Sequence, residues 1–348
     1  MKNLKFIVCI LIILFKTGNV LSNNNIFNVN NVEINKEIYK NNEKLVNQAF
    51  RRAFDQLLNR VLLKEDYKKF SNISLNEIKE LILYYQIINP DKNDKSNFTK
   101  INVFFDKDKM HNFFNIKNVL YSDIVNTEVV LFPLLKKDEK YFIYTKNYFY
   151  ENWNKKDYEE LIQYILPSEN IESIEAINTF KDNIFKLNVS NFFKEYESEN
   201  VVFLNIDINK NVAKILVNTR IEGKKINKNI LIKNKKNFTK NEFNNHIILS
   251  VNNVIADLIK SQNLIDVKTP SFLNVAIKLD NKKSNLAEFN NRVKKIDLID
   301  NYYVQQINKD YVLIKIRYLG KINKIINKLK KQNIDLKMIK GQWQLNII

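Results

Sequence analysis

The scarcity of glycine limits what this chain can build more than any other feature does. Only four glycines, Gly18, Gly223, Gly320 and Gly341, occur in 348 residues, and they stand far apart. Loops that cradle phosphate groups need clustered glycines, because their backbone N–H groups must approach the ligand closely. The strained Gly-x-Ser-x-Gly turn of esterase-like hydrolases needs two glycines around one serine. The sequence therefore excludes both kinds of site.

The sequence also contains few residues of the types that other catalytic sites require. His111 and His246 are the only histidines, and neither stands near a second candidate metal ligand in the sequence. A zinc site or a Ser-His-Asp triad is therefore not expected, and both histidines are interpreted as ordinary surface or helix residues. We expect no catalytic, cofactor-binding or metal-binding residue and no enzyme activity. One enzymatic alternative stays open, a carboxylate-dependent hydrolase of envelope glycans, although no two acids stand out as its pair.

The N-terminus predicts export. Lys2 and Lys5 form a short basic start, and an almost unbroken apolar stretch follows over residues 6–15. This pattern is typical of a signal peptide, and it is shorter than the roughly 20 apolar residues of a membrane-spanning helix. We expect cleavage between Ser22 and Asn23 and a periplasmic location. The alternative is an uncleaved membrane anchor, which the break in the apolar run at Lys16 argues against.

The predicted leader also contains Cys9, the only cysteine. The mature protein of residues 23–348 therefore has no thiol nucleophile, disulfide or thiolate metal ligand, and its stability must come from burial. Its length suits two or three domains of about 100–150 residues each. We predict an N-terminal α+β domain over 23–118, a middle α/β domain over 119–268 and a C-terminal domain over 269–348.

The net charge predicts a basic surface. It is +18 for the whole chain, and the three lysines and no acids of the leader leave +15 for the mature protein. In an exported protein this charge favours anionic lipid, lipopolysaccharide or an acidic protein as partner, and not nucleic acid. The alternative is that the charge has no function, because Lys, Asn and Ile are all overused, as in genomes rich in A and T.

Hydrophobic periodicity predicts the elements of the first domain. A strand is expected over residues 26–34, followed by a helix over 43–63 with a broad apolar face. Ser74 and Glu77 form the Ser-x-x-Glu pattern of a capped helix start, and this second helix is expected to end before Pro90. A strand over 101–105 and a short helix complete the domain.

The middle domain is expected to be a layered α/β unit. A buried strand begins at Val129 and is predicted to end at Pro133, since proline cannot donate to a sheet ladder. A helix is predicted from Asp157 to Ile165. Three segments, 201–208, 212–220 and 226–232, predict an antiparallel meander, and a long helix that carries Phe243 and Leu258 closes the unit.

The C-terminal domain has the clearest pattern. Strands are expected over residues 273–279, 302–307, 312–318 and 343–347, with helices over 286–296 and 322–329. The order βαββαβ predicts a ferredoxin-like unit whose helices cover one sheet face. Strand alternation places Lys278, Lys315 and Arg317 on the other face, which is therefore a possible contact for a partner or an anion. The alternative is that this face packs against the middle domain.

Several segments resemble a family of uncharacterised proteobacterial envelope proteins, the domain of unknown function DUF2066. The helix core Ala-Phe-Arg-Arg-Ala-Phe-Asp-Gln-Leu-Leu at 49–58 is similar to the family's first helix. Residues 130–133 and 152–153 are similar to its middle strand and its Trp-containing segment. Residues 318–320 and 341–345 are similar to its C-terminal ending. The resemblance covers most of the mature protein, contains no catalytic motif, and implies location and architecture only.

Together these observations predict a multidomain α+β protein that acts as a periplasmic accessory or scaffold protein of the bacterial cell envelope. We expect it to be non-enzymatic, to need no cofactor, and to bind other envelope proteins through domain surfaces. The alternative binding function uses the basic face of Lys278, Lys315 and Arg317 to hold anionic lipid or lipopolysaccharide.

Overall fold

A computed structural model describes most of the chain, and the chain divides into two compact units. The first unit contains the described parts of residues 1–49, 80–111 and 268–348, and the second contains those of 50–79 and 112–267. The predicted leader, with its cleavage site at Ser22 and Asn23, lies outside the described residues. Those residues are 26–38, 41–88, 97–124, 126–154, 161–196, 198–235, 238–278, 285–339 and 341–348.

The described residues combine helices with separate β-sheets, which confirms the mixed α and β class. The predicted domain limits at 118 and 268 stay a prediction. The first three α-helices among the described residues are α2 (Asn42–Val61), α3 (Leu75–Leu81) and α4 (Lys107–Lys117). Helix α2 follows its predicted stripe, because Ala49, Ala53 and Leu57 are fully buried.

The predicted capping box at the start of α3 is confirmed. The Glu77 carboxylate accepts hydrogen bonds from the Ser74 backbone N–H at 2.8 Å and hydroxyl at 2.7 Å. In return the Glu77 backbone N–H donates to the Ser74 hydroxyl at 3.2 Å. These bonds satisfy donors that the first turn of a helix leaves unpaired.

The predicted end of this helix before Pro90 is wrong. The helix ends at Leu81, and the polypeptide continues as a strand in a three-stranded sheet of order β1-β3-β2. Pairing with β3 overrides helix formation here, because residues 82–88 are rich in Ile and Tyr, which favour strands, and Tyr84 stacks on Phe104 with ring centroids 4.3 Å apart. The strands are β1 (Asn28–Asn35), β2 (Ile82–Ile88) and β3 (Phe98–Phe105).

The C-terminal part of the first unit forms a five-stranded sheet of order β13-β14-β12-β16-β15. The sequence predicted four strands and missed β15, which follows the second helix. Ile334 and Leu336 are buried in this strand, and it pairs antiparallel with β16, which itself lies parallel to β12. The elements are β12 (Ser271–Lys278), α8 (Asn285–Val293), β13 (Ile299–Ile307), β14 (Tyr311–Tyr318), α9 (Ile322–Lys331), β15 (Ile334–Ile339) and β16 (Gln342–Ile347).

The second unit is built on a sheet of order β10-β9-β8-β5-β6, with β7 paired to β5. Its meander has the predicted strands, and β8 is parallel to β5. The strands are β5 (Thr127–Lys137), β6 (Lys140–Phe142), β7 (Ile162–Ile165), β8 (Val201–Asn209), β9 (Val212–Ile221) and β10 (Lys224–Lys233). A short pair joins β4 (Tyr121–Ser122) to β11 (Leu264–Ile265).

Strand β5 runs through Pro133, so the predicted end of this strand is wrong. On one side Pro133 pairs with Leu204 of β8. On the other side β7 pairs only with residues 127–130 and β6 only with 135–137, so no ladder hydrogen bond is required where the proline stands. Proline is tolerated at such an edge position. The side-chain amide of Asn147 fills the gap by donating to the Pro133 carbonyl at 2.6 Å.

The predicted helix from Asp157 to Ile165 is also wrong in its described part. Residues 162–165 form β7, which pairs in parallel with the start of β5. Its residues Ile-Gln-Tyr-Ile favour a strand. The helices that follow β5 in this unit are α5 (Tyr148–Asn152), α6 (Ile171–Thr179) and α7 (Lys240–Gln262), with two short 3-10 helices at Ile184–Lys186 and Val189–Phe193.

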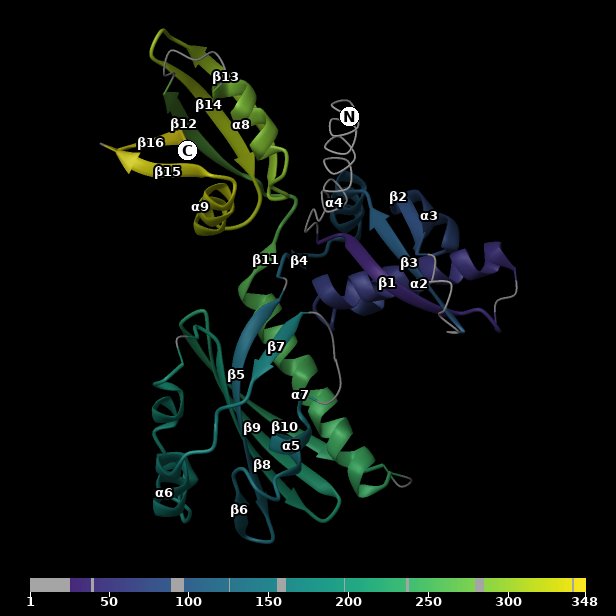
Figure 1. The fold of residues 1–348 in the computed structure, drawn as a ribbon, viewed down its shortest axis with the longest axis vertical. Helices are drawn as coiled ribbons and strands as arrows, with labels where there is room; N and C mark the ends of the chain where they lie inside the picture. The colour runs from purple at the N-terminus through teal and green to yellow at the C-terminus, as the bar shows by residue number, and fades with distance from the viewer. Residues whose placement is uncertain are drawn as a thin grey trace, which may run out of the picture. The chain divides into compact units, whose positions relative to one another are not determined.

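The sheet of the second unit separates two hydrophobic cores. Helix α7, which begins at a Thr239–Glu242 capping box, covers one face of the meander through residues such as Ile247, Val251 and Ile255 (Figure 1). On the other face, α6 and residues 184–193 pack over β5 and β8 around Phe132 and Phe203. The outer strands β9 and β10 extend beyond this second layer.

Candidate functional site

One cavity of the second unit lies where the covering layer stops. It is a groove of about 720 Å³ between the face of the meander that is opposite α7 and the segment of residues 184–193. We call this cavity the meander groove and residues 184–193 the covering segment. The volume falls within the roughly 300–1,000 Å³ that is usual for ligand pockets.

Strand alternation determines which side chains enter the meander groove. In β9 the even-numbered residues Leu216, Asn218 and Arg220 face the groove, and the odd-numbered residues from Ala213 to Val217 are buried against α7. Strand β10 presents Lys225, Asn227 and Asn229 to the same side. Apart from Thr219, which belongs to the opposite face of β9, the lining residues from the sheet therefore share one face, as expected for a pleated strand.

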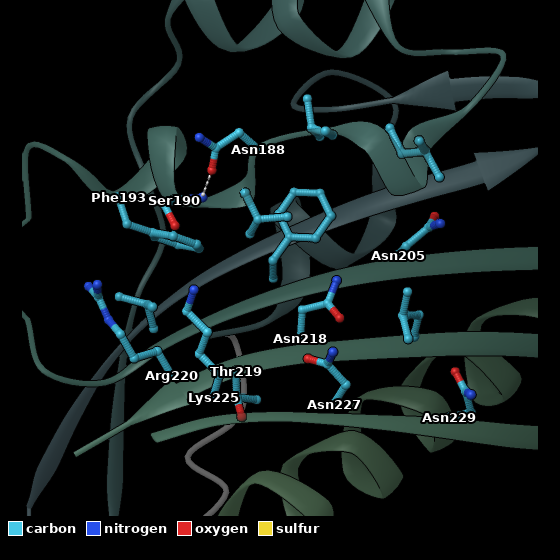
Figure 2. A pocket seen from close by; sticks show the side chains of 16 residues that line it. Asn188, Ser190, Phe193, Asn205, Asn218, Thr219, Arg220, Lys225, Asn227 and Asn229 are labelled. Atoms are coloured by element: carbon cyan, nitrogen blue, oxygen red, sulfur yellow. Dashed lines mark hydrogen bonds between the residues drawn. The ribbon is translucent and has the colours of Figure 1, made fainter. Parts of the chain in front are cut away.

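The strand register arranges these side chains in three rows across the sheet. Arg220 lies opposite Lys225, Asn218 lies opposite Asn227, and Leu216 lies between Asn229 and Asn205 of β8. Figure 2 shows Arg220 and Lys225 at one end of the groove, Asn205 and Asn229 at the other, and Asn218 with Asn227 between them. The groove is thus cationic at one end and carries uncharged amides along the rest of its floor.

The covering segment supplies an apolar wall. Leu187, Val189 and Phe193 line the groove from this side, and Leu187 and Phe193 are also buried in the second core. Asn188 starts the second short helix by accepting the Ser190 backbone N–H at 3.2 Å, which fixes the turn of the wall. On the floor, Phe203 stacks on Phe132 with centroids 5.5 Å apart. The wall therefore belongs to the packed core of the unit.

The electrostatics of the groove favour an anion at one end. Arg220 and Lys225 are direct cross-strand neighbours, and like charges in such a pair are destabilising. Neither forms an ion pair with any residue that the structure describes. No aspartate or glutamate is among the sixteen residues that line the groove. A carboxylate or phosphate between the two side chains would relieve their repulsion.

At the end of the groove that carries Asn205 and Asn229, one hydrogen-bond acceptor has no donor. The Asn205 side-chain oxygen is buried, yet it accepts no hydrogen bond from the protein. A buried acceptor without a donor costs about 1–3 kcal/mol, so a ligand donor at this position would be favourable. Chemically, the groove can donate and accept hydrogen bonds and hold an anion. Its lining includes no histidine or carboxylate that could act as a general base.

The structure places the predicted contact residues Lys278, Lys315 and Arg317 on one face of the C-terminal sheet, but it does not gather them. Along the paired strands, Lys278 stands level with Tyr311, four residues from Lys315, or about 13 Å at 3.3 Å per residue. The Arg317 guanidinium pairs with Asp300 at 3.0 Å. The amino group of Lys315 lies 4.4 Å from the centroid of the Phe272 ring.

The histidines do not form a site together. His111 is buried, and its ring lies edge-on to Phe27 with centroids 5.5 Å apart. Burial, with Lys107 one helical turn away, lowers the pKa of His111 to about 4. His246 contacts the Phe238 ring edge-on at 5.8 Å. Among the described residues no group of three or more His, Cys, Asp or Glu side chains is placed to hold a metal ion.

A smaller cavity of about 330 Å³ in the second unit surrounds a buried lysine. The Lys260 amino group donates to the backbone carbonyls of Asn59 and Leu62, the latter at 3.0 Å. These carbonyls lie at the C-terminal end of α2, where a cation satisfies unpaired acceptors and the helix dipole. This contact explains the lysine as a structural cap.

Sequence reasoning missed the meander groove. Asparagine is abundant throughout the protein, so no single asparagine of the groove indicated a binding site. A signal was available in the pattern, because Asn227 and Asn229 alternate along one predicted strand, directly after Lys225, and Asn218 and Arg220 alternate along its neighbour.

No helix within the described residues is both long enough and apolar enough to cross a membrane. Comparisons of the sequence with protein-family models, with curated proteins and with solved structures gave no match.

Proposed function

We propose that this protein is a secreted, non-enzymatic accessory or scaffold protein of a bacterial cell envelope, and that it binds another envelope component in the meander groove. The observation that carries the binding function is the groove itself, with its paired cations Arg220 and Lys225, its amide floor and its apolar wall. The location rests on the signal-peptide pattern of residues 1–22 and on the resemblance to the DUF2066 envelope family. Both remain proposals.

Two finer statements about the fold are also proposals. The C-terminal segment is a ferredoxin-like unit in which β16 is inserted between β12 and the strand that follows the second helix. The antiparallel pairing of β14 with β12 and β13, with a helix on each side of this hairpin in the sequence, supports this interpretation. The second unit is a layered α/β unit, supported by its two cores on opposite sheet faces.

The function can be tested with a benzophenone group introduced at position 227, on the groove face of β10, in the full-length protein in its native cells. The matched control carries the same group at Lys228, which is also exposed but pairs with Val217 on the opposite face of the strand. We expect a crosslinked adduct at position 227 and none at 228, in a protein whose first residue is Asn23. Equal labelling at both positions, or a cytoplasmic protein with residues 1–22 attached, would contradict the proposal.

A further inference from the structure

We propose that the ligand of the meander groove is an extended peptide segment with a carboxylate at one end, lying along β9 and β10 with the carboxylate between Arg220 and Lys225. This inference rests on the proposed binding function of the groove and names its ligand class. The carboxylate is either the C-terminus of a polypeptide or an acidic side chain.

The first argument is the repeat of the site. The rows of Arg220, Asn218 and Leu216 are each separated by two residues of one strand, which is about 6.6 Å. An extended peptide repeats over the same distance, because it has the same backbone geometry. A peptide parallel to the strands therefore meets each row with an equivalent part of its backbone. The three rows span about 13 Å, which is the length of about four extended residues.

The second argument is the chemistry of the rows. An asparagine side chain presents one carbonyl acceptor and one NH₂ donor, which is the complement of the carbonyl and N–H of a peptide group. Asn218 and Asn227 offer this combination side by side in the middle row, and Asn229 and Asn205 offer it in the last row. The buried Asn205 oxygen, which has no protein donor, is available for a peptide N–H.

The third argument is the difference between the ends of the groove. Cross-strand neighbours have Cβ atoms about 4.5–5.5 Å apart, so the Arg220 and Lys225 side chains can reach one carboxylate together. No acidic residue lines the groove to neutralise them. The wall formed by Leu187, Val189 and Phe193 suits apolar side chains on alternate ligand residues. The preferred ligand is therefore a short strand with apolar residues and a terminal negative charge.

The test uses the purified full mature protein and three pools of N-acetylated pentapeptides, with retained peptides identified by mass spectrometry. One pool has a free C-terminal carboxylate, the second has an amidated C-terminus and no acidic residue, and the third is amidated with aspartate at its last position. We expect at least ten-fold greater retention from the first or the third pool than from the second. The comparison between the first and third pools separates a polypeptide terminus from an acidic side chain.

The double variant Arg220→Gln, Lys225→Gln should lose at least ten-fold of this retention. The matched control Lys224→Gln, Lys228→Gln removes the same charge from the other face of β10 and should bind like the parent. Asn218→Leu should weaken retention from all pools. Near-ultraviolet circular dichroism and melting temperatures establish that each variant is folded.

Three results would overturn the inference. These are equal retention of all pools, retention that survives the Arg220 and Lys225 double variant, and selective binding of trigalacturonate, an anionic glycan, with no peptide retained. If crosslinking at position 227 succeeds while every peptide pool fails, the groove is a binding site for another class of ligand and only this inference falls. If crosslinking also fails, the proposed function falls with it.

Discussion

At the scale of single residues, one buried asparagine joins three segments of the second unit. The Asn147 side chain donates to the carbonyls of Pro133, Phe142 and Ile143 at 2.6, 3.1 and 2.7 Å, and it accepts the backbone N–H of Phe149 at 3.1 Å. It therefore caps α5 and occupies the gap in the sheet beside the proline. No other residue type combines these donors and this acceptor at that length.

We predict that Asn147→Ala lowers the free energy of unfolding by about 2–4 kcal/mol, because it leaves several buried carbonyls without a donor. Urea denaturation of the purified protein measures this loss. The control Asn178→Ala, at an exposed position of α6, should change stability by less than about 0.5 kcal/mol. A similar small effect at position 147 would show that water replaces the side chain.

His111 predicts a pH dependence of stability. Its pKa is lowered to about 4 by burial, from an ordinary value of 6.5, so the unfolded protein binds a proton in a range where the folded protein does not. The free energy of unfolding is therefore not reduced by His111 above pH 6.5. It falls as the pH decreases from 6.5 toward 4, by up to about 1.4 kcal/mol per pH unit. His111→Phe should flatten this slope in urea denaturation between pH 7 and 5. An unchanged slope in the variant would assign it to other groups.

At the scale of elements, the scarcity of glycine affects the turns. Within the part of the chain that the structure describes, nine residues other than glycine have a positive φ, among them Lys210 at 49° in the turn between β8 and β9. Side chains disfavour this conformation by about 1–2 kcal/mol, and glycine does not. The protein therefore carries strain in turns where other proteins use glycine, and asparagine, which tolerates this region better, takes four of the nine positions.

We predict that Lys210→Gly raises the free energy of unfolding by up to about 1 kcal/mol, because relief of the strained backbone exceeds the entropy that glycine adds to the unfolded state. Thermal denaturation measures the gain. Asn211→Gly is the matched control, since this neighbour does not have a positive φ, and it should give no gain. If Lys210→Gly instead lowered the free energy of unfolding, the lysine side chain would stabilise the protein by more than the strain of its positive φ destabilises it.

The elements also show how far sequence reasoning reaches. The capped start at Ser74, the meander and the long helix α7 were predictable, because their signals are local and agree with their tertiary contacts. The strands β2 and β7 were not, because each owes its conformation to a partner strand elsewhere in the sequence. The meander groove was missed for a similar reason, since only the register brings Arg220 beside Lys225. Strand β15 was also missed, although its partner β16 follows it directly in a hairpin.

At the scale of the whole molecule, the division into two compact units predicts unfolding in two steps. Scanning calorimetry should show two heat-absorption transitions. Ile206→Ala, in the core of the second unit, and Ile314→Ala, in the C-terminal sheet, remove fully buried side chains of equal size. Each should destabilise its own unit by about 2–5 kcal/mol and lower only one transition. A single transition with equal calorimetric and van't Hoff enthalpies would contradict this prediction.

The placement of Arg220 directly opposite Lys225 has a practical consequence. A compound that binds only the folded protein stabilises it by about 2.7 kcal/mol at a concentration one hundred times its dissociation constant. An anion that settles between these two cations also removes their mutual repulsion. The melting temperature can therefore report whether the groove is occupied. Fractions of a cell extract can be ranked by how far they raise the melting temperature of the protein. Fractions that do not raise the melting temperature of the Arg220→Gln, Lys225→Gln variant contain candidates for the natural ligand.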